Sequence, residues 1–190
     1  MKLLIVNETE CNGSSQVSVS MMADSTMMRS GMPFFIPDFA PHFGVTPMLA
    51  LRVGRLGKCI APRFAHRYID AVSAAFIVTP LDHELSPINT DDMMRAFDGA
   101  AIMGSWTEFN PTKPLPSLKW SHNNEEHIIN ACDLAVNYER AIEHISRFCT
   151  IKMGDILCLK AQGATPQLVK VEDRIEAHVN DIAVVKSKIK

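Results

Sequence analysis

The run AVSAAFIV at residues 71–78 decides the fold, because it joins small and β-branched residues without a single charge. Such an uninterrupted apolar run is typical of a strand that is buried on both faces. The run LALRV at residues 49–53 predicts a second strand, and Gly54-Arg55-Leu56-Gly57 predicts the turn that closes it. Further short apolar or alternating runs predict strands at residues 3–6, 17–19, 100–106, 156–159, 168–179 and 182–189.

Helical patterns are few and short. Residues 136–149 give the clearest one, with Val136, Ile142, Ile145 and Cys149 on one side and charged residues on the other. Pro62 suits the first turn of a short helix over residues 61–68, and Asn89 begins a polar, capping-type start to another over residues 89–97. Together these patterns predict an α+β fold that is mainly β, with antiparallel or mixed sheets.

The connecting segments carry turn signals. Residues 118–129 predict a hairpin that turns at Asn123-Asn124, and Ser30-Gly31 predicts a second hairpin turn. Residues 7–16 and 110–116 predict loops, and Lys152-Met153-Gly154-Asp155 predicts a turn. Prolines 37, 41 and 47 predict an extended, irregular stretch.

Composition limits the class of protein. The chain has 190 residues, 47% of them apolar, which predicts one domain over residues 1–190 with a full hydrophobic core. Nineteen Lys and Arg against 21 Asp and Glu give a net charge of −2, so we expect no nucleic-acid partner. No run is long enough to span a membrane, and Met1–Val6 is followed at once by polar residues instead of a secretory segment. We therefore expect a cytoplasmic protein with no membrane partner.

The motifs with chemical potential do not form a recognisable active site. The five cysteines are widely spaced and lack a C-x-x-C pair, which predicts reduced thiols. Residues 54–58, GRLGK, have the wrong spacing for a phosphate loop, and His122 and His127 are five apart instead of the four that a zinc protease helix needs. Asp82-His83-Glu84 gathers three potential ligands, but its setting predicts a solvated turn.

Five segments resemble one known family in order and spacing. They are GMPFFIPDF at 31–39, LALRVGR at 49–55, FAHRYIDAV at 64–72, FDGAAIMG at 97–104 and FCTIKMGDIL at 148–157. They resemble segments of the fumarylacetoacetate hydrolase family, which includes acylpyruvate hydrolases, 2-oxo acid isomerases and decarboxylases. The resemblance covers residues 21–190 and implies the family's mixed β-sandwich roll with short peripheral helices; residues 1–20 resemble a shortened N-terminal segment.

The resemblance also places the family's working residues on this chain. Its chemistry needs a divalent metal, usually Mg²⁺, held by carboxylates, yet these positions align with Thr46, Met48 and Ile77. Its catalytic lysine aligns with Arg95. The implied substrate-binding positions are Asp98, Lys160 and Ala161. The shortened N-terminal segment offers Asn7, Glu8 and Glu10, with no histidine before His42.

Three hypotheses follow from this pattern of matches and departures. The first is a non-catalytic homologue that needs no cofactor and binds a small 2-oxo acid or acts as a scaffold. The second is an active hydrolase, isomerase or decarboxylase of a 2-oxo acid, which uses a rebuilt site and Mg²⁺ or Mn²⁺, or no metal. The third is a subunit that pairs with an active relative. By analogy with the family, we expect a homodimer.

Overall fold

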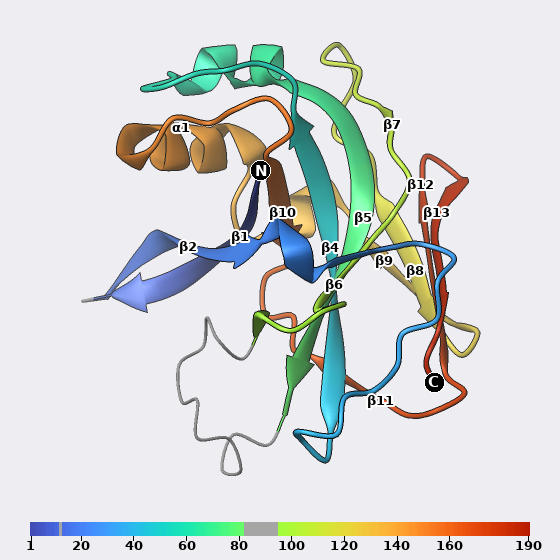
Figure 1. Cartoon of the computed structure of the whole chain (residues 1–190). Helices are drawn as coiled ribbons and strands as arrows, with labels where there is room; N and C mark the ends of the chain where they lie inside the picture. The colour runs from blue at the N-terminus through green and yellow to red at the C-terminus, as the bar shows by residue number, and fades with distance from the viewer. Residues whose placement is uncertain (12, 82–94) are drawn as a thin grey trace.

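The computed structural model describes residues 1–11, 13–81 and 95–190. Two sheets form most of this structure, and short helices lie outside them (Figure 1). Within the described residues, no helix is both long and apolar enough to cross a membrane. The α+β, mainly β fold class predicted from the sequence is therefore confirmed.

The larger sheet has nine strands in the described part of the chain, and its main path runs β2-β1-β10-β4-β5-β6-β3. In addition, β11 pairs with β4 and β7 pairs with β5. The strands are β1 (Lys2–Cys11), β2 (Ser14–Ala23), β3 (Met27–Arg29), β4 (Phe43–Val53), β5 (Ile69–Pro80), β6 (Ala101–Met103), β7 (Thr107–Glu108), β10 (Ile156–Lys160) and β11 (Gln167–Val169). Strand β1 pairs with β10 in parallel, so residues 3–6 lie beside residues 156–159, far from them in the sequence.

The smaller sheet has four strands in the order β13-β12-β8-β9. They are β8 (Leu118–His122), β9 (Glu125–Ile129), β12 (Arg174–Val179) and β13 (Ile182–Lys188). This sheet packs against one face of the larger one, where the Phe76 and Trp120 rings meet edge to face at 6.1 Å between centroids. It lies to the right of β5 in Figure 1.

Strands β4 and β5 separate two apolar clusters, because successive side chains of a strand point to opposite faces. Phe76 and Val78 belong to the larger cluster, which faces the small sheet. Ala75 and Ile77 belong to the second cluster on the other face. The uninterrupted apolar run of residues 71–78 is thus explained by burial on both sides.

The helices in the described part of the chain are short and lie outside the sheets (Figure 1). They are the 3₁₀ helices η1 (Asp24–Thr26), η2 (Pro62–Tyr68) and η5 (Ala131–Asp133), and the α-helix α1 (Tyr138–Phe148). The Asn137 side chain caps α1 by accepting a hydrogen bond from the backbone N–H of Arg140. Ile142 and Ile145 are buried, as the helical pattern predicted. The predicted helix at residues 89–97 lies largely outside the described residues.

The predicted loop at residues 7–16 is wrong. Strand β1 continues to Cys11, and β2 pairs with it along its whole length around a turn at Gly13, which has a φ of 73°. The polar side chains here belong to an exposed hairpin. Backbone hydrogen bonds between β1 and β2 hold it together, and such bonds leave no apolar pattern in the sequence. The predicted turn at Asn123-Asn124 is confirmed, with positive φ at both residues.

Three further expectations need correction. Ser30-Gly31 is a turn but not a hairpin, because β3 pairs in parallel with β6. Pro47 lies inside β4, in the gap between the residues that pair with β11 and those that pair with β10, where a missing N–H is tolerated. The predicted strand 168–179 is two strands, interrupted where Asp173 accepts a hydrogen bond from the backbone N–H of Lys170 at 2.8 Å.

Candidate functional site

The three positions that align with the family's metal ligands lie together on one face of the larger sheet. Thr46 of β4 is the direct register partner of Ile77 on β5. Met48 lies two residues along β4 and therefore on the same face as Thr46. All three residues are buried, with exposed fractions of 3% for Thr46 and Met48 and 2% for Ile77.

The residues at these positions do not fit a hard divalent cation. Mg²⁺ prefers carboxylate, carbonyl and water oxygens. Here the side chains supply one hydroxyl, one thioether, which suits soft ions, and one alkyl group with no donor atom. Among the described residues, no group of three His, Cys, Asp or Glu side chains is placed to hold a metal ion.

The surroundings of these positions are apolar. The second cluster, which contains Met48 and Ile77, also includes Leu3, Ile5, Met22, Ala50, Ala75, Ala100, Ala101, Met103, Ile156 and Cys158. Cys158 is fully buried, and burial raises the pKa of its thiol to about 12. At neutral pH this thiol stays protonated, so it packs as a small apolar group and does not act as a nucleophile.

Two cations lie beside this apolar face. Lys160 ends β10 in register with Met48, and the Arg95 guanidinium Nη1 donates a hydrogen bond to Ser20 Oγ at 3.1 Å. Partial burial lowers the pKa of Lys160, and the positive charge of Arg95 lowers it further. Within residues 1–11, 13–81 and 95–190, neither cation forms an ion pair with a carboxylate. The two side chains give this part of the sheet a local positive charge, which suits an anionic ligand.

The other two predicted substrate positions contribute less. Ala161 is buried, and it pairs through its backbone with Leu134 in an isolated bridge. Its methyl group offers no hydrogen bond to a ligand. Asp98 is exposed in the turn that follows Arg95. The structure therefore brings Arg95 and Lys160 together but does not place Asp98 with them.

A small cavity lies between the β1–β2 hairpin and the turn after β10. It has a volume of about 210 Å³ and is lined in part by Asn7, Glu8, Glu10, Gln162 and Gly163. Glu8 pairs with Arg140 of α1 at 3.4 Å. The polar residues Asn7, Glu8 and Glu10 thus lie near the turn that follows Lys160 and Ala161, two of the implied substrate-binding positions.

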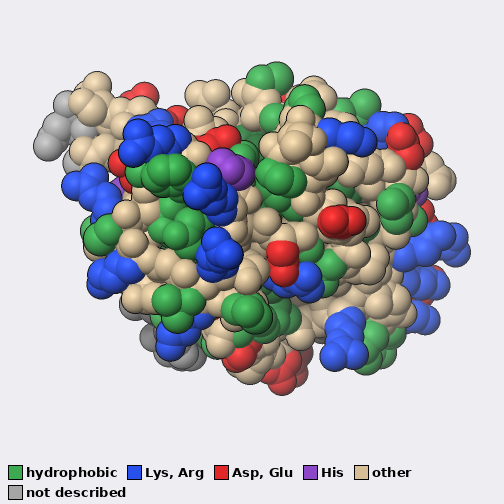
Figure 2. Space-filling model, turned by 90° about the horizontal axis from the view of Figure 1, so that it is seen from above, with side chains coloured by type: hydrophobic (Ala, Val, Ile, Leu, Met, Phe, Trp, Pro, Cys, Tyr) green, Lys and Arg blue, Asp and Glu red, His purple; other side chains and the backbone are tan. Residues whose placement is uncertain are grey.

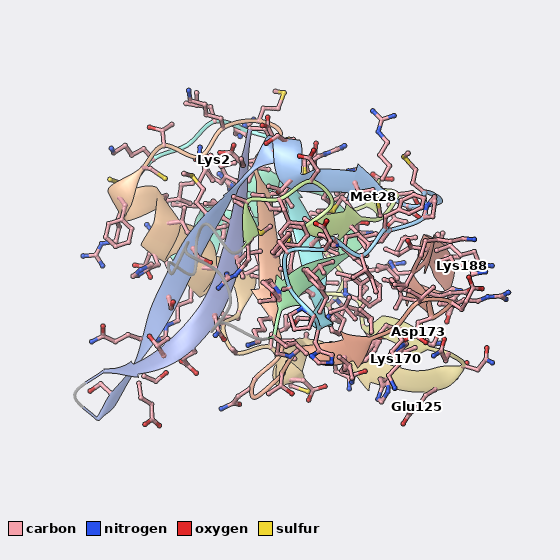
Figure 3. All side chains as sticks on the ribbon, turned by 60° about the horizontal axis from the view of Figure 1, so that its bottom comes forward. Lys2, Met28, Glu125, Lys170, Asp173 and Lys188 are labelled. Atoms are coloured by element: carbon pink, nitrogen blue, oxygen red, sulfur yellow. The ribbon has the colours of Figure 1, made fainter. Side chains whose placement is uncertain are left out.

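The rejected motifs have structural roles. His122 binds the Asp173 carboxylate at 2.8 Å, in the group of side chains at the right of Figure 3, and the His127 ring stacks on Trp120 at 4.4 Å. Gly57, inside the GRLGK run, packs so tightly that a Cβ there would lie 2.3 Å from the Tyr68 ring. Asp82-His83-Glu84 lies outside the described residues.

Sequence reasoning missed Ser20, the hydrogen-bond partner of Arg95. The available signal was the alternation of Ser18, Ser20 and Met22 on β2, which places the three residues on one face. The proximity of Ser20 to Arg95 joins segments that are distant in the sequence, and no local pattern could reveal it.

Comparison with known proteins places this geometry in context. A family model described as the C-terminal domain of fumarylacetoacetate (FAA) hydrolase matches residues 8–190. A search of curated proteins found no match.

Several solved structures share the fold. A fumarylacetoacetate hydrolase family protein from Yersinia pestis superposes with a TM-score of 0.81 at 21% identity, covering 100% of this chain and 92% of its own. A 5-carboxymethyl-2-hydroxymuconate delta-isomerase from Mycobacterium smegmatis has a TM-score of 0.83 at 16% identity, covering 99% and 78%. Fumarylpyruvate hydrolase from Pseudomonas aeruginosa, in complex with Mn²⁺ and pyruvate, has a TM-score of 0.82 at 12% identity, covering 100% and 89%. At these identities the likeness concerns the fold.

Proposed function

This chain belongs to the fumarylacetoacetate hydrolase family, and we propose that it is a member without metal-dependent hydrolase or decarboxylase chemistry, which binds a small carboxylate without converting it. One observation carries the proposal: the positions that align with the metal ligands, Thr46, Met48 and Ile77, converge on a buried apolar face. The proposed loss of metal-binding side chains is therefore concentrated at one place in the fold.

The energetic argument concerns the charge that develops during the reaction. A bound metal ion polarises the substrate carbonyl and stabilises the developing enolate, which is usually the largest single contribution to such catalysis. A thioether and an alkyl chain offer no comparable stabilisation. They also make the binding of a hydrated Mg²⁺ ion unfavourable, because the ion would lose water oxygens without gaining protein oxygens.

Arg95 and Lys160 support the retained binding function. A guanidinium can hold a carboxylate through two parallel hydrogen bonds, and an ammonium adds a second point charge. A structural neighbour was solved in complex with pyruvate. We therefore propose a 2-oxo acid such as pyruvate as the ligand class, with Arg95 as the main contact.

Calorimetric titration tests both parts of the proposal. We expect no binding of Mn²⁺ or Mg²⁺ at millimolar concentration, and weak binding of pyruvate that is lost in Arg95→Gln. Arg140→Gln, which removes an exposed guanidinium near the small cavity, serves as the control and should leave pyruvate binding intact. A Mn²⁺ ion seen in a soaked crystal between Thr46 and Ile77 would overturn the proposal.

A second candidate is an active enzyme with a metal-free site, and Lys160 is the residue that favours it. A lysine that is partly desolvated and lies near another cation has more of its amine in the neutral, nucleophilic form. Its nitrogen would attack the 2-oxo carbon, and after uptake of one proton from solvent the carbonyl oxygen would leave as water to give a protonated imine. In a 2-oxo acid with a second carboxyl group on the next carbon, the C–C electron pair would move toward the imine as CO₂ leaves. Water would then hydrolyse the product and release the lysine.

Borohydride trapping distinguishes the two candidates. If the second holds, pyruvate plus borohydride leaves on Lys160 an adduct with the mass of pyruvic acid less one oxygen atom. The adduct should disappear in Lys160→Met and remain in the control Lys170→Met, which changes an exposed lysine of the 170–173 turn. Absence of any adduct on the wild-type protein would exclude the imine route and favour the non-catalytic reading.

Assembly and location are part of the same proposal. By analogy with the family, we propose a homodimer. The cysteine thiols lead us to propose a cytoplasmic location. Cys59, Cys132, Cys149 and Cys158 are all free, which suits a reducing compartment. Sedimentation velocity of the purified protein tests the dimer.

A further inference from the structure

A basic and apolar surface lies where η2 meets the end of α1. Gly57 and Ile151 exchange two backbone hydrogen bonds of 3.0 and 2.9 Å, and Cys59 donates one to the Ser146 carbonyl. We call this surface the basic face. It is formed by Arg55, Leu56, Lys58, Arg63, Phe64, Arg67, Arg147, Phe148, Lys152 and Met153.

The basic face has a strong local excess of positive charge. The two segments that build it, residues 53–69 and 144–154, contain no Asp or Glu at all. The bordering carboxylates already have partners: Asp70 binds Arg52 at 2.9 Å, and Asp155 binds Lys2 at 2.5 Å. Glu143, one helical turn before Arg147, is the nearest other carboxylate in the sequence. In the described part of the chain, none of the six cations of the basic face forms an ion pair.

Exposed apolar side chains stand among these cations. Leu56, Phe148 and Met153 have exposed fractions of 65%, 71% and 74%. The guanidinium groups of Arg63 and Arg67 lie over the Phe64 ring at 4.8 and 4.9 Å. Figure 2, which looks down on this end of the molecule, shows blue and green side chains interspersed over its left half.

We propose that the basic face docks on the surface of an anionic lipid bilayer. Apolar side chains that project from loops and a helix end can enter the boundary between headgroups and acyl chains, while cations around them bind lipid phosphates and carboxylates. The net charge of −2 for the whole chain conceals this local concentration, which is why composition led us to expect no membrane partner. The proposed docking is peripheral.

Two other partners fit the surface less well. A second copy across a two-fold axis would set the patch against itself and bring six cations toward six cations, with no carboxylates of its own to offset them. A nucleic acid would use the cations but leave the protruding Leu56 and Met153 without a role, because phosphate contacts are made by charged and polar groups.

Vesicle co-sedimentation tests the proposal with the full chain. We expect binding to phosphatidylserine vesicles that weakens with salt, and no binding to phosphatidylcholine vesicles. Arg63→Gln with Arg67→Gln and Arg147→Gln should weaken binding about fivefold per cation, or roughly a hundredfold together. Leu56→Ser with Phe148→Ser and Met153→Ser should also weaken it while leaving the cations in place.

The matched control removes three cations elsewhere, with Lys170→Gln, Lys186→Gln and Lys188→Gln. Figure 3 shows Lys170 and Lys188 at the far side of the molecule from Lys2, which borders the basic face. The control should bind vesicles as the wild type does. The proposal would be overturned if anionic vesicles did not bind the protein, or if the control lost as much binding as the arginine variant. It would also be overturned if DNA or RNA bound more tightly than vesicles, or if the serine variant dissociated a dimer.

Discussion

Introducing carboxylates at the three aligned positions tests the site most directly. The variant combines Thr46→Glu, Met48→Glu and Ile77→Asp, and it places three acidic groups on one buried face. Met48 and Ile77 are 3% and 2% exposed, so without metal these groups would be buried charges that lack a partner. We expect the variant to fold less stably than the wild type and to gain stability when Mn²⁺ is added.

The size of the effect follows from burial. An unpaired buried charge costs about 3–5 kcal/mol. For a chain of 150–250 residues, each kcal/mol corresponds to a shift of roughly 2–4 °C in Tm. Ile77→Asp alone should therefore lower Tm by about 6–20 °C. If the three carboxylates form a metal site, Mn²⁺ at 100 times its Kd should restore about 2.7 kcal/mol.

Thermal unfolding with and without Mn²⁺ measures both quantities. Ile128→Asp is the matched control, since it makes the same change as Ile77→Asp at a side chain that is 57% exposed, and it should shift stability by about 0.5 kcal/mol at most. If the triple variant without metal is as stable as the wild type, Ile77 is not buried at this face. If Mn²⁺ leaves the Tm of the variant unchanged, the three positions do not converge on a former metal site.

Three other predictions concern activity and stability. The wild type should show no metal-dependent turnover of oxaloacetate or acylpyruvates in a coupled assay, and turnover that Arg95→Gln abolishes would contradict the reading. For Asp155, burial opposes ionisation, but hydrogen bonds from Lys2 and Lys152 outweigh it and hold its pKa below the usual value. Asp155→Asn should therefore lower the free energy of unfolding by about 3 kcal/mol at neutral pH. In denaturant titrations, the difference between variant and wild type should shrink as the pH falls below about 4. A difference that stays constant with pH would refute the lowered pKa of Asp155. Ser146→Ala removes the hydroxyl that accepts a hydrogen bond from the Ile60 N–H at 2.9 Å. The free energy of unfolding should fall by about 1–3 kcal/mol, and a measured loss outside this range would argue against that bond.

The strands and helices that could be predicted were those in which the spacing of apolar residues follows directly from which side chains are buried. The apolar run at 71–78 and the amphipathic run at 136–149 both correspond to observed elements, β5 and α1. In the hairpin over residues 2–23, only residues 3–6 and 17–19 could be predicted as strand, because its outer part is exposed on both faces and carries polar side chains. Likewise, the break at Lys170–Asp173 depends on one side-chain hydrogen bond that apolar periodicity does not report.

The site was predictable only in part, for a related reason. A resemblance in sequence could align Thr46, Met48 and Ile77, but their convergence is a property of the β4–β5 register. The proximity of Arg95 to Lys160 depends on segments far apart in the sequence, because Arg95 bonds to Ser20 of β2 and Lys160 ends β10. Such pairings are set by the whole sheet, so local sequence carries no signal for them.

The parallel pairing of β1 with β10 has a consequence for the time course of folding. Residues 3–6 lie in the sheet between β2 and β10, and their partners in β10 are residues 156–159. The backbone N–H of Lys2 also donates a hydrogen bond to the Asp155 carboxylate, 153 positions away in the sequence. During synthesis, the β1–β2 hairpin must therefore wait for most of the chain to leave the ribosome before its inner edge is paired. Contacts this distant in sequence make folding slow. We expect the nascent chain to depend on chaperones during that interval, because an open strand edge is prone to aggregation.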